Sequence, residues 1–275
     1  MSRQSLMRLS QQLAGWVAGL IGVVALFVLW AVVSVAGFPP DPGTGFTPVP
    51  PPWTVLSEMA AAGPSAFWGG VLRETLMEAS IGFLWGNLIA LLLASLVLLV
   101  PWLEPVIMQI AVTTYCLPVV AVGGISIVVL GGAEQPGDPS KTSIFLAALM
   151  VFFTTVVGAV LGFKSADRAS LDVVRVYGGS VWTQLVKVRL VAAVPAILNA
   201  LQIAVPTAIL GAVLGEYLGS TDRGVGRTLI VLQGKPDPER LWAVFLVCAL
   251  VALAGYLLLG LVSRLVTPWV AGRSG

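Results

Sequence analysis

Charge is what this sequence has least of. Among its 275 residues, 15 are basic, 13 are acidic and none is histidine, so charged residues make up 10% of the chain while hydrophobic residues make up 57%. Ordinary soluble domains carry about 25% charged residues. A soluble domain of this size would lack the polar groups that its surface requires. The composition therefore excludes a soluble globular protein and predicts a protein that lies in a bilayer.

Histidine is absent and cysteine nearly so. The absence of histidine excludes histidine general bases, histidine proton shuttles and histidine-ligated metals. Cys116 and Cys248 fall in apolar segments without metal-ligand spacing, so we interpret them as packing residues and expect no metal site. The phosphate-loop pattern G-x-x-x-x-G-K-[ST] is also missing. We therefore do not expect this chain to bind ATP itself.

Long apolar runs are what the sequence has in abundance. Six stretches contain no acidic or basic residue, and each exceeds the ~20 residues that a helix needs to cross ~30 Å of hydrocarbon. The alternating pattern of a membrane barrel is not seen. The sequence thus predicts an all-α integral membrane protein. Its six expected transmembrane helices lie near residues 14–36, 72–100, 105–130, 142–163, 191–216 and 241–265.

The distribution of basic residues predicts the orientation of these spans. Lysine and arginine are more numerous on the side that holds the two tails and the loop 164–190, so the positive-inside rule places both termini in the cytoplasm. The basic residues of the loop 217–240 argue against this placement. After the first span, FPPDPGTGFTPVPPPW predicts an extended external connector. We divide the chain into an anchor helix with its connector, residues 1–68, and a transmembrane core, residues 69–275.

The loop 164–190 contains the polar stretch LDVVRVYGGSVWTQLVKVRL. The spacing of Leu171, Val174 and Tyr177 predicts a short helix with an apolar stripe. The glycine pair that follows predicts the end of this helix, and Ser180 is placed to cap a second one. We interpret the stretch as two short helices around a turn on the cytoplasmic side. Such a turn either docks onto a partner or lies on the lipid headgroups.

The order of residues in this loop resembles the signature of binding-protein-dependent ABC importer permeases, often written E-A-A-x(3)-G-x(9)-I-x-L-P. Asp172 stands where that family has glutamate, and Gly178 matches the glycine of the signature. Val173 and Val174 replace the two alanines, and Val191 replaces a proline. Roughly residues 50–265 are similar to the subfamily of nitrate, sulfonate, taurine, bicarbonate and thiamine-precursor permeases.

This resemblance implies a non-enzymatic transport subunit in the inner membrane, whose coupling helix docks into a separate ABC ATP-binding subunit. It implies ATP and Mg on that partner and no cofactor on this chain. The other implied partners are a second permease chain, identical or different, and an extracytoplasmic solute-binding protein; no nucleic acid is expected. The residues that the resemblance assigns to coupling are Leu171, Asp172, Arg175, Tyr177, Gly178, Gly179, Ser180 and Trp182.

Polar residues within the apolar spans predict a translocation pathway, because such residues are costly in lipid. One group shares a face of the fifth span at i, i+3 and i+7, and another precedes a proline in the third span. A proline also frees a backbone carbonyl that protein or a water-filled cavity must satisfy. Ordinary hydrogen bonding between helices is the other interpretation. The candidates are Thr114, Tyr115, Pro118, Asn199, Gln202 and Pro206.

Two features close to the end of the fifth span are interpreted from position and spacing. Glu216 falls near the outer membrane interface, where we expect a solvated carboxylate. Gly211, Gly215 and Gly219 are spaced by four and predict a seam for close helix packing. This seam lies either between helices of one chain or between two permease chains.

Two other classes of function compete with an ATP-driven importer of a small anion or vitamin precursor. An ion-coupled secondary carrier acting alone would place ionisable residues in the middle of its spans. A membrane-embedded enzyme would place clustered acids or a nucleophile with a base near one membrane face. The sequence offers neither arrangement, and it does not identify the substrate.

Overall fold

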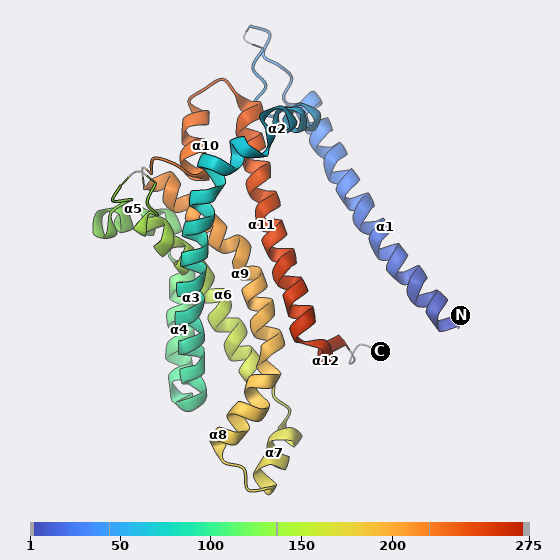
Figure 1. Ribbon diagram of the computed structural model, residues 1–275, viewed down its shortest axis with the longest axis vertical. Coiled ribbons are helices and arrows are strands. Elements are labelled where there is room, and N and C mark those ends of the chain that lie inside the picture. Colours follow the sequence, from blue (N-terminus) through green and yellow to red (C-terminus); the bar gives the residue numbers. More distant parts are fainter. Residues whose placement is uncertain (1–2, 44, 136, 220, 272–275) are drawn as a thin grey trace. The chain divides into compact units, whose positions relative to one another are not determined.

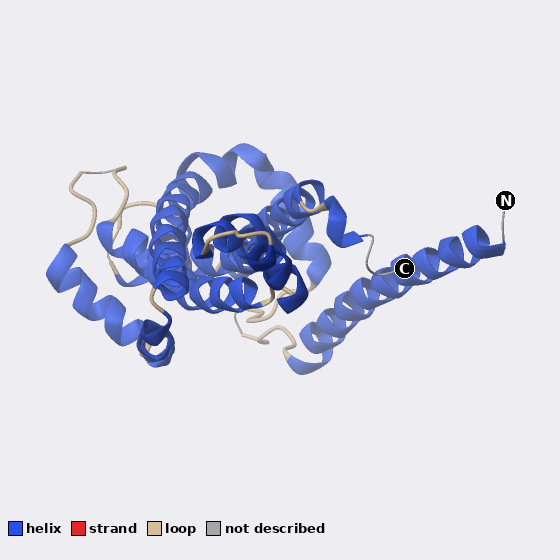
Figure 2. Ribbon diagram, turned by 90° about the horizontal axis from the view of Figure 1, so that it is seen from below, coloured by secondary structure: helices blue, strands red, loops and turns tan. Residues whose placement is uncertain are grey.

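The computed structural model describes residues 3–43, 45–135, 137–219 and 221–271. These residues form helices and connecting loops, without a strand among them (Figure 2). The chain divides into two compact units. One unit is Met1–Pro64 with Val231–Val244, and the other is Ser65–Ile230 with Phe245–Gly275.

In the first unit, side chains donate hydrogen bonds to backbone carbonyl groups of the proline-rich connector. The indole Nε1 of Trp30 donates to the carbonyl of Pro50 at 3.1 Å, and the Ser34 hydroxyl donates to Val49 at 2.7 Å. Prolines have no N–H with which to build regular backbone pairs, so such side-chain donors satisfy this segment. The Trp30 ring also stacks on Trp242 with ring centroids 5.5 Å apart.

The helices follow the apolar runs closely. They are α1 (Arg3–Val32), η1 (Val33–Gly37), α2 (Pro52–Phe67), η2 (Trp68–Leu72), α3 (Arg73–Leu99), η3 (Pro101–Leu103), α4 (Glu104–Cys116), α5 (Val119–Leu130), α6 (Lys141–Lys164), α7 (Arg168–Val176), α8 (Val181–Gln184), η4 (Leu185–Arg189), α9 (Leu190–Leu218), α10 (Val225–Gln233), α11 (Pro238–Val266) and α12 (Pro268–Ala271).

Five helical segments are long and apolar enough to cross a membrane, which confirms the predicted class of fold. They are Val17–Gly37, Pro52–Leu99, Lys141–Lys164, Val181–Leu218 and Pro238–Val266. Helices η3 and α4 form a sixth candidate span only if they are counted together with α5.

The predicted third span, 105–130, is not one straight helix. It consists of α4 and α5, which are bent by 93° at a short break. The break contains Pro118, and Leu117 before it adopts an extended backbone with ψ 133°. A proline disfavours the helical conformation of the residue that precedes it, which explains why the helix ends there.

In the second unit, α6 packs between α3 and α9 through glycines. A Cβ atom at Gly215 of α9 would lie 2.3 Å from the Cα of Ser143 in α6, and one at Gly211 would lie 2.6 Å from the Cα of Ala147. These distances leave room for hydrogen only, so the backbones of α6 and α9 approach closely. The predicted seam therefore packs two helices of the same chain. Gly219 lies beyond it, at the end of α9.

Figure 1 shows the two ends of this unit. Helices α7 and α8 lie at one end, drawn in yellow. Helix α5 and the loop between α9 and α10 lie at the other end. Helix α9 runs between these ends.

Candidate functional site

Two glycines build the turn between α7 and α8, each for a different reason. Gly178 has a φ of 76°, which is a left-handed conformation that glycine adopts without strain. Its N–H donates to the carbonyl of Arg175 at 3.0 Å, and the N–H of Gly179 donates to Val174 at 2.8 Å. This pair of bonds is the Schellman motif that ends many helices. At Gly179, a Cβ atom would lie 2.4 Å from Cγ1 of Val174, so the close contact excludes larger residues.

The second helix of this turn begins as predicted. The hydroxyl of Ser180 accepts a hydrogen bond from the backbone N–H of Thr183 at 3.2 Å, which caps α8. Tyr177, by contrast, does not belong to an apolar stripe of α7. It follows the last helical residue and is 87% exposed, because the turn begins there.

The α7–α8 loop, residues 168–184, presents large apolar side chains to its surroundings. Val176, Val181 and Trp182 are exposed, as is Tyr177. Asp172 and Arg175 lie on the same loop with 3.9 Å between their charged groups, and both side chains are largely exposed. A surface that combines exposed aromatic and aliphatic groups with charges resembles the composition of binding surfaces.

The structure places the two groups of predicted pathway residues against different neighbours. On α4, Tyr115 stacks on Phe153 of α6 with ring centroids 4.5 Å apart. Thr114 lines a groove on α4 together with Gln109 and Thr113, and its hydroxyl donates to the Ile110 carbonyl at 2.8 Å. Pro118 lies at the break between α4 and α5.

On α9, the amide of Gln202 packs against α11. A Cβ atom at Gly260 would lie 2.5 Å from its Nε2 atom. Asn199 is exposed, and Pro206 is partly buried within the continuous helix α9. The predicted pathway residues of α4 and those of α9 therefore contact different parts of the described chain and do not line a common pocket.

Glu216 corrects the expectation of a solvated carboxylate, because its side chain is fully buried. The Thr75 hydroxyl of α3 donates to its Oε1 at 2.5 Å, and the Gly226 N–H donates to its Oε2 at 2.6 Å. The N–H of Val225 in turn donates to the Thr75 hydroxyl at 2.9 Å. A buried carboxylate requires such partners. Gly224 leaves room for it, since a Cβ atom there would lie 2.4 Å from the carboxyl group.

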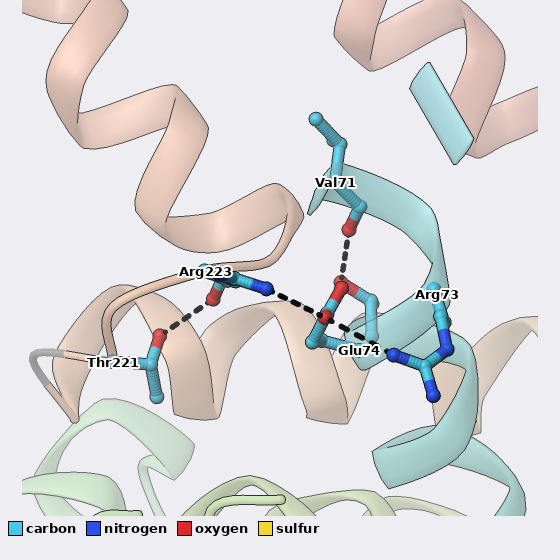
Figure 3. Close-up of polar contacts among 6 residues, drawn as sticks. Val71, Arg73, Glu74, Thr221 and Arg223 are labelled. Atoms are coloured by element: carbon cyan, nitrogen blue, oxygen red, sulfur yellow. Dashed lines mark hydrogen bonds and ion pairs between the residues drawn. The ribbon is translucent and has the colours of Figure 1, made fainter. Parts of the chain in front are cut away.

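Two more buried glutamates extend this buried acidic network along α3. Glu78 Oε1 accepts the N–H of Ser140 at 2.6 Å, at the start of α6. Arg73 and Arg223 each place a guanidinium nitrogen 3.9 Å from Glu74 Oε1, and Figure 3 shows Arg223 reaching from the loop before α10. The network thus connects α3, α6, α9 and the α9–α10 loop at the end of the unit opposite the α7–α8 loop.

Sequence analysis did not identify Glu74, Thr75 or Glu78 as members of a site. The available signal was the spacing of the two glutamates at i and i+4, which places both on one face of α3. The second carboxylate oxygen of each, Oε2, is buried and has no hydrogen-bond partner among the residues that the structure describes. No group of histidine, cysteine or acidic residues suited to a metal ion occurs in that part of the chain.

The long apolar helices, the bent pair and the exposed α7–α8 loop define a multi-pass helical membrane protein. The family model of the binding-protein-dependent transport system inner membrane component matches residues 86–272. The chain belongs to this family, so it is the permease component of a binding-protein-dependent ABC importer in the inner membrane.

Individual relatives agree with this assignment. A "Probable ABC transporter permease protein" of Haemophilus influenzae is 30% identical over 184 residues, covering 67% of this chain and 72% of the relative. The riboflavin transport system permease protein RibX of Chloroflexus aurantiacus is 28% identical, covering 62% and 61%. The formylaminopyrimidine transport permease protein ThiX of Halalkalibacterium halodurans is 25% identical, covering 72% and 76%.

A solved structure supports the fold. A chain from the crystal structure of a bacterial ABC transporter involved in the import of the acidic polysaccharide alginate superimposes with a TM-score of 0.59. It covers 96% of this chain and 97% of its own length at 17% identity. Membership of the family implies partners that bind ATP and deliver solute, and it makes this chain a transport component without ATPase activity of its own.

Proposed function

We propose that the α7–α8 loop is the surface through which this permease contacts its ATP-binding subunit. The observation that supports this proposal is the set of exposed side chains around the left-handed Gly178: Val176, Tyr177, Val181 and Trp182. Burial of such groups in a cleft of a partner supplies binding energy at ~25 cal/mol per Å² of apolar surface removed from water. Asp172 and Arg175 add charges that set the register of the contact.

The proposed transport cycle follows from this contact. ATP and Mg bind to the partner, and closure of two ATPases moves the α7–α8 loops of two permease chains, which are either identical or different. Helix α9, which follows the loop, carries this movement through the membrane. A solute-binding protein delivers the substrate from outside, with both termini and the loop in the cytoplasm.

The substrate that we propose is a small solute, either an anion of the nitrate, sulfonate or taurine type or a vitamin precursor. Relatives are named for riboflavin, formylaminopyrimidine and aliphatic sulfonate transport, so both classes are kept in the proposal. Thr114, Tyr115, Asn199 and Gln202 would offer neutral hydrogen-bonding groups along the pathway, and the prolines Pro118 and Pro206 would allow α4–α5 and α9 to bend.

Removing the docking surface tests the coupling proposal. We expect Gly178→Leu, which forces a side chain into a left-handed backbone, and Trp182→Ala, which removes only exposed surface, each to reduce the amount of ATPase that copurifies with the tagged chain by at least about tenfold. Trp102→Ala is the matched control, because Trp102 is also an exposed tryptophan but lies outside the loop. Undiminished ATPase in both loop variants would remove coupling from this loop.

The pathway is tested separately by uptake. Gln202→Leu keeps the size of the side chain but removes its amide, so we expect uptake of the labelled substrate to fall at least severalfold while the ATPase still copurifies. Unchanged uptake in this variant would place the pathway elsewhere.

A further inference from the structure

A cavity of about 240 Å³ lies beside the α7–α8 loop, within the second unit. The ends of α3, α4 and α6 form one side of it, and α8 with η4 forms the other. Its wall is divided between apolar side chains and a polar group of four residues: Glu104, Lys164, Gln184 and Arg189. We propose that this cavity binds a phosphate-bearing anion, for which the headgroup of an anionic phospholipid is the expected source.

The polar wall contains hydrogen-bond donors without a protein partner. Gln184 is only 8% exposed, and its side-chain amide forms no hydrogen bond within the described residues. The amide atoms are not among the fully buried polar atoms of the described residues, so a group in the cavity could hydrogen-bond to them. Arg189 also lines the cavity, and its guanidinium has no ion pair with a residue that the structure describes. An amide and a guanidinium that face one space suit an oxyanion with several acceptor oxygens.

The charge of the cavity is positive overall. Lys164 Nζ lies 2.5 Å from Glu104 Oε1, so these two charges compensate each other. Arg189 adds a positive charge that no carboxylate in the wall balances. An anionic ligand would supply the missing charge, and a zwitterionic headgroup would supply it less well.

Size and surroundings favour a headgroup over a whole metabolite. Pockets for drug-sized molecules measure ~300–1,000 Å³, which is larger than this cavity. Apolar side chains such as Leu98 and Phe163 continue from the polar wall and suit the first part of an acyl chain. Lys164 ends α6 and Arg189 directly precedes α9, so the polar wall lies where spans leave the hydrocarbon. Basic pockets between helices at this depth bind anionic headgroups.

A ligand in this cavity would connect the α7–α8 loop to the transmembrane helices. Gln184 belongs to α8, and Glu104 and Lys164 belong to α4 and α6. A phosphate held by Gln184 and Lys164 would restrain α8 against the end of α6, whereas the Glu104 carboxylate only pairs with Lys164. The ligand is thus expected to stabilise the isolated permease, whether or not the loop docks onto an ATPase.

Binding is tested with the purified full-length chain in mild detergent. Native mass spectrometry would measure retained phosphatidylglycerol and phosphatidylcholine, and thermal unfolding would be followed with either lipid or with inorganic phosphate. We expect the wild type to retain phosphatidylglycerol in preference to phosphatidylcholine. Arg189→Gln should weaken phosphatidylglycerol binding by about tenfold, because it removes a charge-assisted contact. Gln184→Glu, which keeps the size but adds a negative charge, should do the same.

Lys187→Gln is the matched control, because Lys187 is an exposed basic residue of η4 that does not line the cavity. It should bind phosphatidylglycerol as the wild type does. Stabilisation by inorganic phosphate that Arg189→Gln abolishes, without selection of phosphatidylglycerol, would support the site with a free phosphate compound as its ligand. Equal retention of both lipids with no effect of phosphate would overturn the proposal. Unchanged binding in both Arg189→Gln and Gln184→Glu would also overturn it.

Discussion

At the scale of single residues, the acidic network is notable because it buries three glutamate side chains, Glu74, Glu78 and Glu216. Buried carboxylates are costly unless they have hydrogen-bond or charge partners. Glu216 lies in the transmembrane helix α9 and is nevertheless fully buried. Its two oxygens receive hydrogen bonds from different parts of the chain, the Thr75 hydroxyl and the Gly226 N–H. Thr75 is central, because its oxygen also accepts the N–H of Val225. One hydroxyl therefore serves both the carboxylate and the start of α10.

Thr75→Val tests this role, because it keeps the shape of the side chain and removes the hydroxyl. Two buried groups would lose a partner, and each such loss costs about 1–3 kcal/mol. We expect the melting temperature of the purified chain to fall by several degrees. Thr207→Val is the control, since the Thr207 hydroxyl donates only to Ala204 in its own helix. Equal melting temperatures of the two variants would contradict a central role for Thr75.

Single residues also show which local features a sequence reveals. The left-handed Gly178 and the cap at Ser180 were predicted correctly, because both depend on neighbours within a few positions. The burial of Glu216 was predicted wrongly, because its partner Thr75 is 141 positions away. The predictions for Gly178 and Ser180 succeeded because their partners are close in sequence, and the one for Glu216 failed because Thr75 is far away in sequence.

At the scale of helices, close packing of α6 against α9 depends on residues without side chains. Gly158 and Gly162 of α6 face alanines of α9, and Gly211 and Gly215 of α9 face the backbone of α6. In a bilayer, helix association is driven by such close van der Waals contact rather than by exclusion of water. The same seam holds α9 next to α6 from the α7–α8 loop to the acidic network.

Gly215→Ala should disrupt this seam. The added Cβ would lie 2.3 Å from the Ser143 Cα, and a backbone atom cannot move aside as a flexible side chain does. Overpacking of this kind costs about 1–3 kcal/mol, so we expect a lower melting temperature. Gly124→Ala is the matched control in α5, where no atom lies within 4 Å of the added group. A similar loss in Gly124→Ala would show that helix glycines matter here for reasons other than packing.

The long helices were predicted well, and the bent pair less well. Apolar runs without charge predicted the central parts of α3, α6, α9 and α11, because lipid excludes unpaired charged side chains. The helices extend past these runs, and α3, for example, begins at Arg73 and contains Glu74 and Glu78. Hydropathy alone does not distinguish a straight span from the bent pair α4–α5, since the two helices together are long and apolar enough for one span. Pro118 was the local signal of the break. A proline is not a reliable signal by itself, because α9 continues through Pro206.

At the scale of the whole molecule, the proposed topology places both termini and the α7–α8 loop in the cytoplasm. Single-cysteine variants test it in a background that lacks Cys116 and Cys248. Glu134→Cys, in the exposed loop before α6, should react with a membrane-impermeant maleimide in intact cells. Asp167→Cys, before α7, should react only after permeabilisation. The reverse pattern would invert the orientation derived from the positive-inside rule.

The acidic network also has a consequence for biosynthesis. Thr75 and Glu216 are separated by 141 residues, so α3 enters the membrane long before its partner exists. At roughly 5–20 residues per second, the ribosome needs about 7 to 28 seconds to make the intervening chain. During that interval Glu74 and Glu78 lack the loop before α10, and Glu78 lacks Ser140 until α6 begins. The early helices must therefore be held at the insertion machinery, or their glutamates kept hydrated, until α9 arrives to complete the bundle.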